Sequence, residues 1–442
     1  MKKLAGTGHV LMSASGVDAN RNAGHISGMD PVTHTFVGAV LGETRLCQTT
    51  AYSRLTLIVA ANLPDIDAVT YFISQDTSLY WRRGWTHGAL AMLLLPLLWT
   101  GAVLGLARLR GRQEQVDPRW VLALSYIGLL SHPALDWLNN YGVRLLMPFS
   151  GTWFYGDAVF IVDPWMWMLL GGFLFLRRSR RTSLPALAWT LFALAATAAV
   201  VLGPGSQLSL QLAWMAGLTA IVLLDWARPS WLMPSRDKGA SPATAKSKGR
   251  RASDQRVHVG VGASANKESP SRRTKESGNL RGQGGSVSAG RAAPAVLALL
   301  LIYILANLGL TSWSESQMRA AMQERGQEIE KMMASPVPLN PLVRDVVIQT
   351  RVGYHYGRLH PLSDPPLQLA SRLIPKLPED DPRVQRAIRQ PQVRGIVNWS
   401  RFPWAVVERR ENSDRVYIMD ARYVRRPTTG FGGAMVELER QR

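Results

Sequence analysis

The sequence predicts a mainly α-helical membrane protein with about seven or eight hydrophobic segments and a small α+β domain at its C-terminal end. Three observations support this prediction. Apolar residues form 47% of the 442-residue chain and gather in blocks about as long as a bilayer is thick. Basic loops separate several of the blocks. Beyond residue 313 the pattern changes to the alternating and turn-rich one of a soluble domain.

Six blocks are strongly apolar, and they cover residues 88–107, 119–138, 158–176, 184–203, 208–226 and 294–313. Two weaker segments precede them. Residues 34–42 are too short to span a bilayer, whereas residues 55–73 are long enough but carry two aspartates. We therefore expect a membrane-embedded domain over 29–228 and a last transmembrane helix over 294–313.

The distribution of basic residues predicts the orientation. The run "RRSRR" at 177–181 and the Ser/Gly-rich segment 229–293 are both rich in Lys and Arg, which places them in the cytoplasm. The last helix then delivers residues 314–442 to the outer side, the periplasm of a bacterial inner membrane. Segment 229–293 reads as a disordered tether, with binding of nucleic acid or anionic lipid as the alternative. We expect no specific nucleic-acid partner, because no aromatic residues alternate with its charges.

The first 28 residues are polar and glycine-rich and form a predicted disordered extension, since the chain from Met29 has the pattern of a natural start. Cys47 is the single cysteine, so neither a disulfide within the chain nor a cysteine-based zinc site can form.

Ionisable side chains inside apolar segments are costly and therefore mark candidate functional sites. The candidates are His34, Asp65, Asp67, His87, His132 and Asp136. The predicted topology places all six near the outer face of the membrane. Imidazoles and carboxylates without thiolates suit a catalytic site for zinc, manganese or iron, with one or two ions.

Each signal also has a structural interpretation. A histidine at a helix start often caps the helix, "NLPDID" at 62–67 can be a helix break, and His132 with Asp136 can be a buried hydrogen-bonded pair. Proton or ion transport uses the same residue types within membranes, so an ion-coupled transporter remains an alternative.

Four short motifs, in this order, carry a family resemblance: "MDPVTHTFVGAVLG", "NLPDID", "RRGWTHG" and "HPALDWLNNYG". Over 29–163 the chain resembles the inner-membrane YdjM-type family of metal-dependent hydrolases, which is distantly similar to zinc-dependent phospholipase C and to single-strand nucleases. The resemblance implies metal ligation by His34, Asp65, His87, His132 and Asp136, and less directly by Asp67. It implies zinc as the first choice of metal.

The chain departs from the family pattern in "RRGWTHG", where Arg82 replaces a histidine and Gly88 replaces a serine. Arg82 and Arg83 could bind a substrate phosphate, for which a guanidinium is suited. The alternative is that they anchor the chain at the interface beside Trp81 and Trp85.

Three residues are candidates for direct roles in catalysis, namely Asp67, Arg83 and Asp163. Asp163, in "IVDPWMW", could act as a general base or could simply cap the helix that begins at Pro164.

The residues after 313 predict a helical stalk over 315–334, strands over 340–359, a helix over 381–400, a hairpin around "ENSD" at 411–414 and a strand at 433–439. His355 and His360 lie five residues apart and would face opposite sides of a strand. We expect this domain to present substrate or to bind a protein partner.

Together these features predict a membrane-bound, metal-dependent hydrolase that cleaves an ester or phosphoester of a lipid or lipid-linked substrate. The bilayer is its expected environment. The alternatives are the ion-coupled transporter and a non-enzymatic membrane scaffold.

Overall fold

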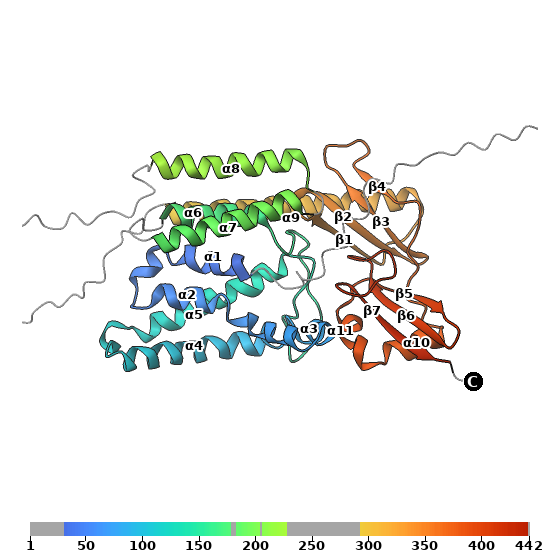
Figure 1. Cartoon of the computed structure of the whole chain (residues 1–442), viewed down its shortest axis with the longest axis horizontal. Coiled ribbons are helices and arrows are strands. Elements are labelled where there is room, and N and C mark those ends of the chain that lie inside the picture. The colour runs from blue at the N-terminus through green and yellow to red at the C-terminus, as the bar shows by residue number, and fades with distance from the viewer. Residues whose placement is uncertain (1–30, 178–182, 204–205, 228–291, 441–442) are drawn as a thin grey trace, which may run out of the picture.

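The computed structural model describes residues 31–177, 183–203, 206–227 and 292–440. The extension 1–28 lies outside the described residues, as does all but the end of the predicted tether 229–293. Figure 1 shows a bundle of helices lying side by side, with two small β-sheets at one end. The helices of the bundle are α1 (Pro31–Leu41), α2 (Ser53–Ala60), α3 (Gln75–Trp81), α4 (Ala89–Leu109), α5 (Pro118–Trp137), α6 (Pro164–Arg177), α7 (Ser183–Leu202), α8 (Leu208–Ala227) and α9 (Ala292–Glu324), with the 3-10 helix η2 (Leu63–Phe72) after α2.

Every apolar block of the sequence contains a helix, but not every helix can cross a membrane. By length and composition four of the described helices can do so: α4, α8, α9 and the part of α7 from Pro185. The pair α2 and η2, bent by 45°, would be a fifth span. The structure thus supports four or five spans where the sequence predicted about seven or eight segments. Helices α1 and α6 are too short, and α5 carries polar side chains.

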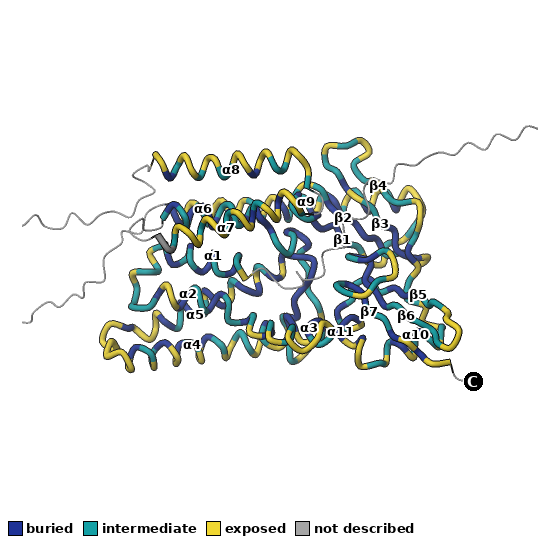
Figure 2. Tube along the Cα trace, in the orientation of Figure 1, coloured by how far each residue is buried: buried dark blue, intermediate teal, exposed yellow. Residues whose placement is uncertain are grey.

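The block at 158–176 is helical only from Pro164, because residues 158–163 form an irregular segment that crosses the end of the bundle. The predicted stalk is also partly wrong. Helix α9 continues without a break through residue 314 to Glu324, but residues 331–334 belong to a strand. The apolar faces of α4, α7 and α8 remain exposed, which suits contact with lipid (Figure 2).

Helix α2 lies between α1 and α5, and glycines allow the close approach. A Cβ atom at Gly38 of α1 would lie 2.9 Å from the carbonyl oxygen of Leu57, and one at Gly128 of α5 would lie 2.8 Å from the same oxygen. His34 precedes Gly38 by one helical turn, and His132 follows Gly128 by one turn. The two imidazole rings consequently stack, with their centroids 3.8 Å apart.

Replacement of Gly128 by valine is expected to lower the free energy of unfolding by about 1–3 kcal/mol, because the carbonyl it would meet is backbone and cannot move aside. Thermal unfolding in detergent measures this. The control is Gly101→Val on α4, where an added Cβ meets nothing within 4 Å. Equal tolerance of both changes would contradict a packing role for Gly128.

The C-terminal part contains two antiparallel sheets. The first has the order β1-β2-β3-β4, and the second has the order β5-β6-β7. The elements are β1 (Lys331–Val337), β2 (Asn340–Thr350), β3 (Gly353–Leu359), β4 (Leu367–Leu369), α10 (Pro382–Ile388), α11 (Arg394–Trp399), β5 (Pro403–Arg409), β6 (Ser413–Asp420) and β7 (Gly433–Glu439). The predicted strands over 340–359, the hairpin and the final strand are confirmed, whereas the single helix predicted over 381–400 is divided into α10 and α11.

This C-terminal domain packs directly on one end of the helical bundle (Figure 1). Leu79 of α3 and Tyr141 share a buried apolar cluster with Ile396 and Trp399 of α11. The carboxylate of Asp76 in α3 accepts hydrogen bonds from the first backbone N–H groups of α11, at 2.6 Å from the nitrogen of Gly395. The two parts therefore share a continuous core.

Candidate metal centre

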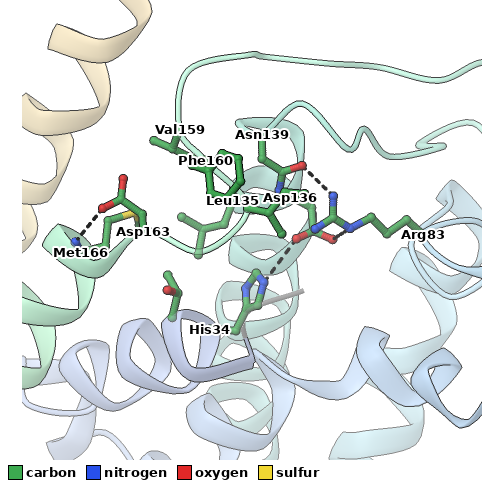
Figure 3. A pocket seen from close by; sticks show the side chains of 11 residues that line it. His34, Arg83, Leu135, Asp136, Asn139, Val159, Phe160, Asp163 and Met166 are labelled. Atoms are coloured by element: carbon green, nitrogen blue, oxygen red, sulfur yellow. Dashed lines mark hydrogen bonds and ion pairs between the residues drawn. The ribbon is translucent and has the colours of Figure 1, made fainter. Parts of the chain in front are cut away.

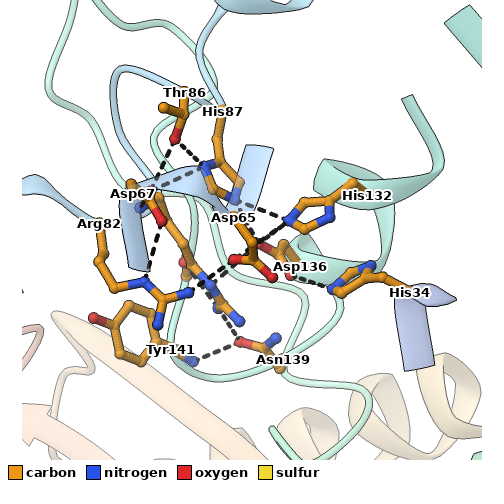
Figure 4. Close-up of polar contacts among 12 residues, drawn as sticks. His34, Asp65, Asp67, Arg82, Thr86, His87, His132, Asp136, Asn139 and Tyr141 are labelled. Carbon is orange, nitrogen blue, oxygen red and sulfur yellow. Dashed lines mark hydrogen bonds and ion pairs between the residues drawn. The ribbon is translucent and has the colours of Figure 1, made fainter. Parts of the chain in front are cut away.

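Six predicted side chains meet near the end of the bundle that the C-terminal domain covers (Figure 4). They come from four segments that are distant in sequence. The residues are His34 of α1, Asp65 and Asp67 of η2, His87 of the turn before α4, and His132 and Asp136 of α5. All are buried except Asp65, which is partly exposed. The predicted convergence of these side chains is confirmed.

Asp136 lies at the middle of the cluster. One carboxylate oxygen is 3.3 Å from Nε2 of His34. The other is 3.2 Å from Nε2 of His87 and 3.6 Å from Nε2 of His132. A carboxylate oxygen of Asp65 lies 3.8 Å from Nε2 of His132. Three imidazoles and two carboxylates thus direct their ligand atoms toward a common space.

The outer contacts of two imidazoles fix their tautomers. Nδ1 of His132 lies 2.7 Å from the carbonyl oxygen of Ala61, which can only accept a hydrogen bond, so Nδ1 carries the proton. Nδ1 of His87 lies 2.9 Å from Oγ1 of Thr86 and 3.4 Å from the Asp67 carboxylate. Because the Thr86 hydroxyl donates its proton to Asp67, its oxygen accepts from His87.

With the Nδ1 protons placed in this way, the neutral form of each ring would present an Nε2 lone pair, and the two Nε2 atoms lie 3.0 Å apart. Two lone pairs at that distance repel unless a proton or a metal cation lies between them. The nearby carboxylate of Asp136 favours a cation in the same space. The donor set of imidazoles and carboxylates fits zinc, manganese or iron.

Two overlapping groups of three have ligand atoms within 4.8 Å of one another: His34 with His132 and Asp136, and Asp65 with His87 and His132. Both include His132, whose Nδ1 is already bonded to Ala61. Its single remaining lone pair binds one ion. The two groups thus describe one shared site rather than two independent sites, and a second ion would have to do without His132.

Asp67 belongs to neither group. One of its carboxylate oxygens accepts the hydroxyl of Thr86 at 2.8 Å and the backbone N–H of Arg83 at 2.9 Å, and it faces Nδ1 of His87. In this position it orients the imidazole from behind, as carboxylates commonly do for metal-binding histidines. Its predicted role as a ligand itself remains a prediction.

Arg82 and Arg83 are 2% and 1% exposed, so interfacial anchoring is wrong for both, whereas Trp81 and Trp85 are 45% and 49% exposed. Arg82 lies 2.8 Å from Asp65. Nε of Arg83 lies 3.1 Å from Asp136. The two arginines act as buried counterions of the candidate ligands.

Burial alone would lower the pKa of the Arg82 guanidinium, but the neighbouring Tyr71, Asp67 and Asp65 outweigh burial and raise its pKa. Arg82 therefore keeps its positive charge and cannot itself bind a metal.

Asp163 lies apart from the cluster, where Oδ1 accepts the backbone N–H groups of Trp165 and Met166 and so caps α6. Oδ2 accepts the hydroxyl of Tyr303 at 2.6 Å. The capping interpretation is thereby confirmed, and a direct catalytic role remains a prediction. Asp163 also lines a cavity of about 30 Å³, together with His34, Asp136 and residues of the segment after α5 (Figure 3).

Sequence reasoning did not identify Asn139 and Tyr141, which complete the surroundings of Arg83. Oδ1 of Asn139 accepts a guanidinium N–H of Arg83 at 2.7 Å, and the Tyr141 ring lies under that guanidinium, 4.5 Å from its carbon. Their place in "HPALDWLNNYG", directly after Asp136, was the only available signal. His355 lies in β3 and His360 follows its end, and neither joins a candidate ligand group among the described residues.

The candidate ligands all fall within one stretch that matches a known family. Residues 29–206 match the YdjM inner membrane protein family. The YdjM match includes all four motifs and confirms the resemblance. Four of the described helices are long and apolar enough to cross a membrane, which agrees with the membrane location in that family's description. No curated protein and no solved structure matches the chain, so a relationship to phospholipase C or to single-strand nucleases stays a prediction.

Proposed function

We propose that this protein is a membrane-bound, metal-dependent hydrolase that cleaves an ester or phosphoester of a lipid or lipid-linked substrate. The observation that carries the proposal is the pair of Nε2 atoms of His87 and His132, 3.0 Å apart beside the Asp136 carboxylate. A divalent metal in such a site lowers the pKa of a bound water and polarises a substrate oxygen.

The residues of the chain have separable tasks in this proposal. His34, His87, His132, Asp136 and Asp65 would hold the metal, most simply a single zinc ion. Asp67 and the carbonyl of Ala61 hold the imidazoles of His87 and His132 in the tautomer that binds metal. Arg83 holds Asp136, and Asp67 would take a proton from the reacting water.

Substrate would reach the site from the outer leaflet. The basic segments at 177–181 and 229–293 support a cytoplasmic position for the far end of the bundle. The end with the metal centre and the C-terminal domain would then face the periplasm. Ile66, Val69 and Phe72 are exposed apolar residues of η2, the same helix that carries the candidate ligand Asp65. Their exposure supports access of a lipid substrate to the site.

The test is metal analysis of protein purified in detergent without chelators, followed by incubation with defined lipids. We expect about one transition metal ion per chain and release of a product by mass spectrometry that stops when the metal is removed. Protein without metal would contradict the proposal. Bound metal without turnover of any ester or phosphoester would favour the ion-coupled transporter or the scaffold.

A further inference from the structure

The C-terminal domain makes three hydrogen bonds, two of them buried and one partly buried, to the two residues Asn140 and Tyr141, just after α5. Arg422 donates to the backbone carbonyl of Asn140 at 2.7 Å. Trp399 donates from Nε1 to the backbone carbonyl of Tyr141 at 3.1 Å. The hydroxyl of Tyr423 donates to Oδ1 of Asn140 at 3.0 Å. All three donors come from the segments that flank β5 and β6.

The donors are themselves held rigidly. Arg422 is fully buried and pairs with the Asp420 carboxylate at 2.8 Å, and it also donates to the carbonyl of Trp399. The indole of Trp399 and the ring of Tyr423 stack, with centroids 5.3 Å apart. A rigid donor set of this kind fixes the position of the backbone that it contacts.

The same backbone segment is attached to the metal centre. The Asn139 side chain accepts both the Tyr141 backbone N–H, at 2.9 Å, and the guanidinium of Arg83. Arg83 also donates to the carbonyl of Gly142 at 3.2 Å, and its Nε faces Asp136 at 3.1 Å. A series of hydrogen bonds through residues 139–142 therefore leads from the C-terminal domain to Arg83, and the Arg83 ion pair completes the connection to the central carboxylate. Figure 4 shows the part of this series around Asn139 and Tyr141.

We infer that the C-terminal domain positions the metal centre: Trp399, Tyr423 and Arg422 hold residues 139–142, which hold Arg83 against Asp136. They are positioning residues, since none of them touches the candidate ligands. The inference rests on the proposed metal centre and gives the C-terminal domain a role in positioning it. Outer partners that hold metal ligands in place commonly affect metal affinity 10–100-fold.

Two matched pairs of variants test this. Trp399→Phe removes the indole donor to Tyr141, and its control Trp404→Phe removes a buried indole donor to Val424 within the domain, also at 3.1 Å. Tyr423→Phe removes the hydroxyl donor to Asn140, and its control Tyr354→Phe removes a hydroxyl donor to Pro403, at 2.8 Å.

The first readout is zinc affinity of the full-length protein in detergent, by competition with a chromophoric chelator. Each variant at the contact with residues 140–141 is expected to weaken zinc binding roughly 3- to 10-fold, and the double variant about 10- to 100-fold. The controls are expected to leave affinity unchanged at a similar melting temperature. Equal affinity in test and control variants, or equal losses in both, would overturn the inference.

The second readout does not depend on metal. Hydrogen–deuterium exchange of the metal-free protein is expected to accelerate in peptides that contain residues 138–144 and 83–87 in the test variants, but not in the controls. If wild-type protein binds no zinc, the proposed metal centre fails while this readout still decides the inference. Unchanged exchange in both peptides would overturn it.

Discussion

Replacement of His132 by alanine is expected to lower the affinity for a divalent metal by at least about 100-fold and to abolish metal retention during purification. His132 is fully buried and is the one residue that both groups of candidate ligands share. Loss of its imidazole removes one ligand atom from both groups, so that neither keeps three ligands.

The measurement is the metal content per chain, compared with wild type and with His355→Ala. His355 is a suitable control, because it is a buried histidine in β3 that lies outside the centre. Metal content that survives in His132→Ala, or that falls equally in His355→Ala, would show that the metal is held elsewhere.

Replacement of Arg83 by methionine is expected to destabilise the metal-free protein by about 3–5 kcal/mol. Arg83 and Asp136 are each 1% exposed, with Nε of the guanidinium 3.1 Å from the carboxylate. Removal of the guanidinium leaves a buried negative charge without its partner, and it leaves the side chain of Asn139 without a donor from Arg83.

The loss of stability in Arg83→Met is expected to be smaller when metal is bound, because the cation then neutralises the Asp136 carboxylate. Unfolding in detergent, with and without saturating zinc, measures both values. The control is Arg351→Met, since the side chain of Arg351 is 82% exposed and its ion pair with Glu328 contributes little. An equal loss with and without zinc would mean that Arg83 does not compensate the charge of Asp136.

Much of the helical architecture follows from local composition. The apolar blocks at 88–107, 184–203, 208–226 and 294–313 each became a helix long enough to span a membrane. The block at 158–176 did not, because Pro164 starts the helix there and the preceding residues cross the end of the bundle. Hydropathy averaged along a segment records how apolar it is, but not where its backbone leaves the helix.

The convergence of the candidate ligands was also accessible from the sequence. His132 and Asp136 lie one turn apart on α5, and His34, His87 and "NLPDID" were expected beside them. The role of Arg83 was not accessible. Its backbone adopts a positive φ of 50°, with its N–H directed toward Asp67 and its side chain toward Asp136. The residue types in "RRGWTHG" do not predict that conformation.

The sequence by itself determined a mainly helical membrane protein, with a YdjM-like stretch over 29–206 that carries the histidines and aspartates of the candidate site. Composition and periodicity are local properties, and they suffice to set the helices and their faces. Only the tertiary structure decided that Asp67 contacts Nδ1 of His87, that Nδ1 of His132 bonds to the carbonyl of Ala61, and that the C-terminal domain contacts the segment beside the candidate centre. These contacts depend on how closely the helices approach one another, as at Gly128, and on pairs of residues hundreds of positions apart. Local sequence patterns contain no information about either.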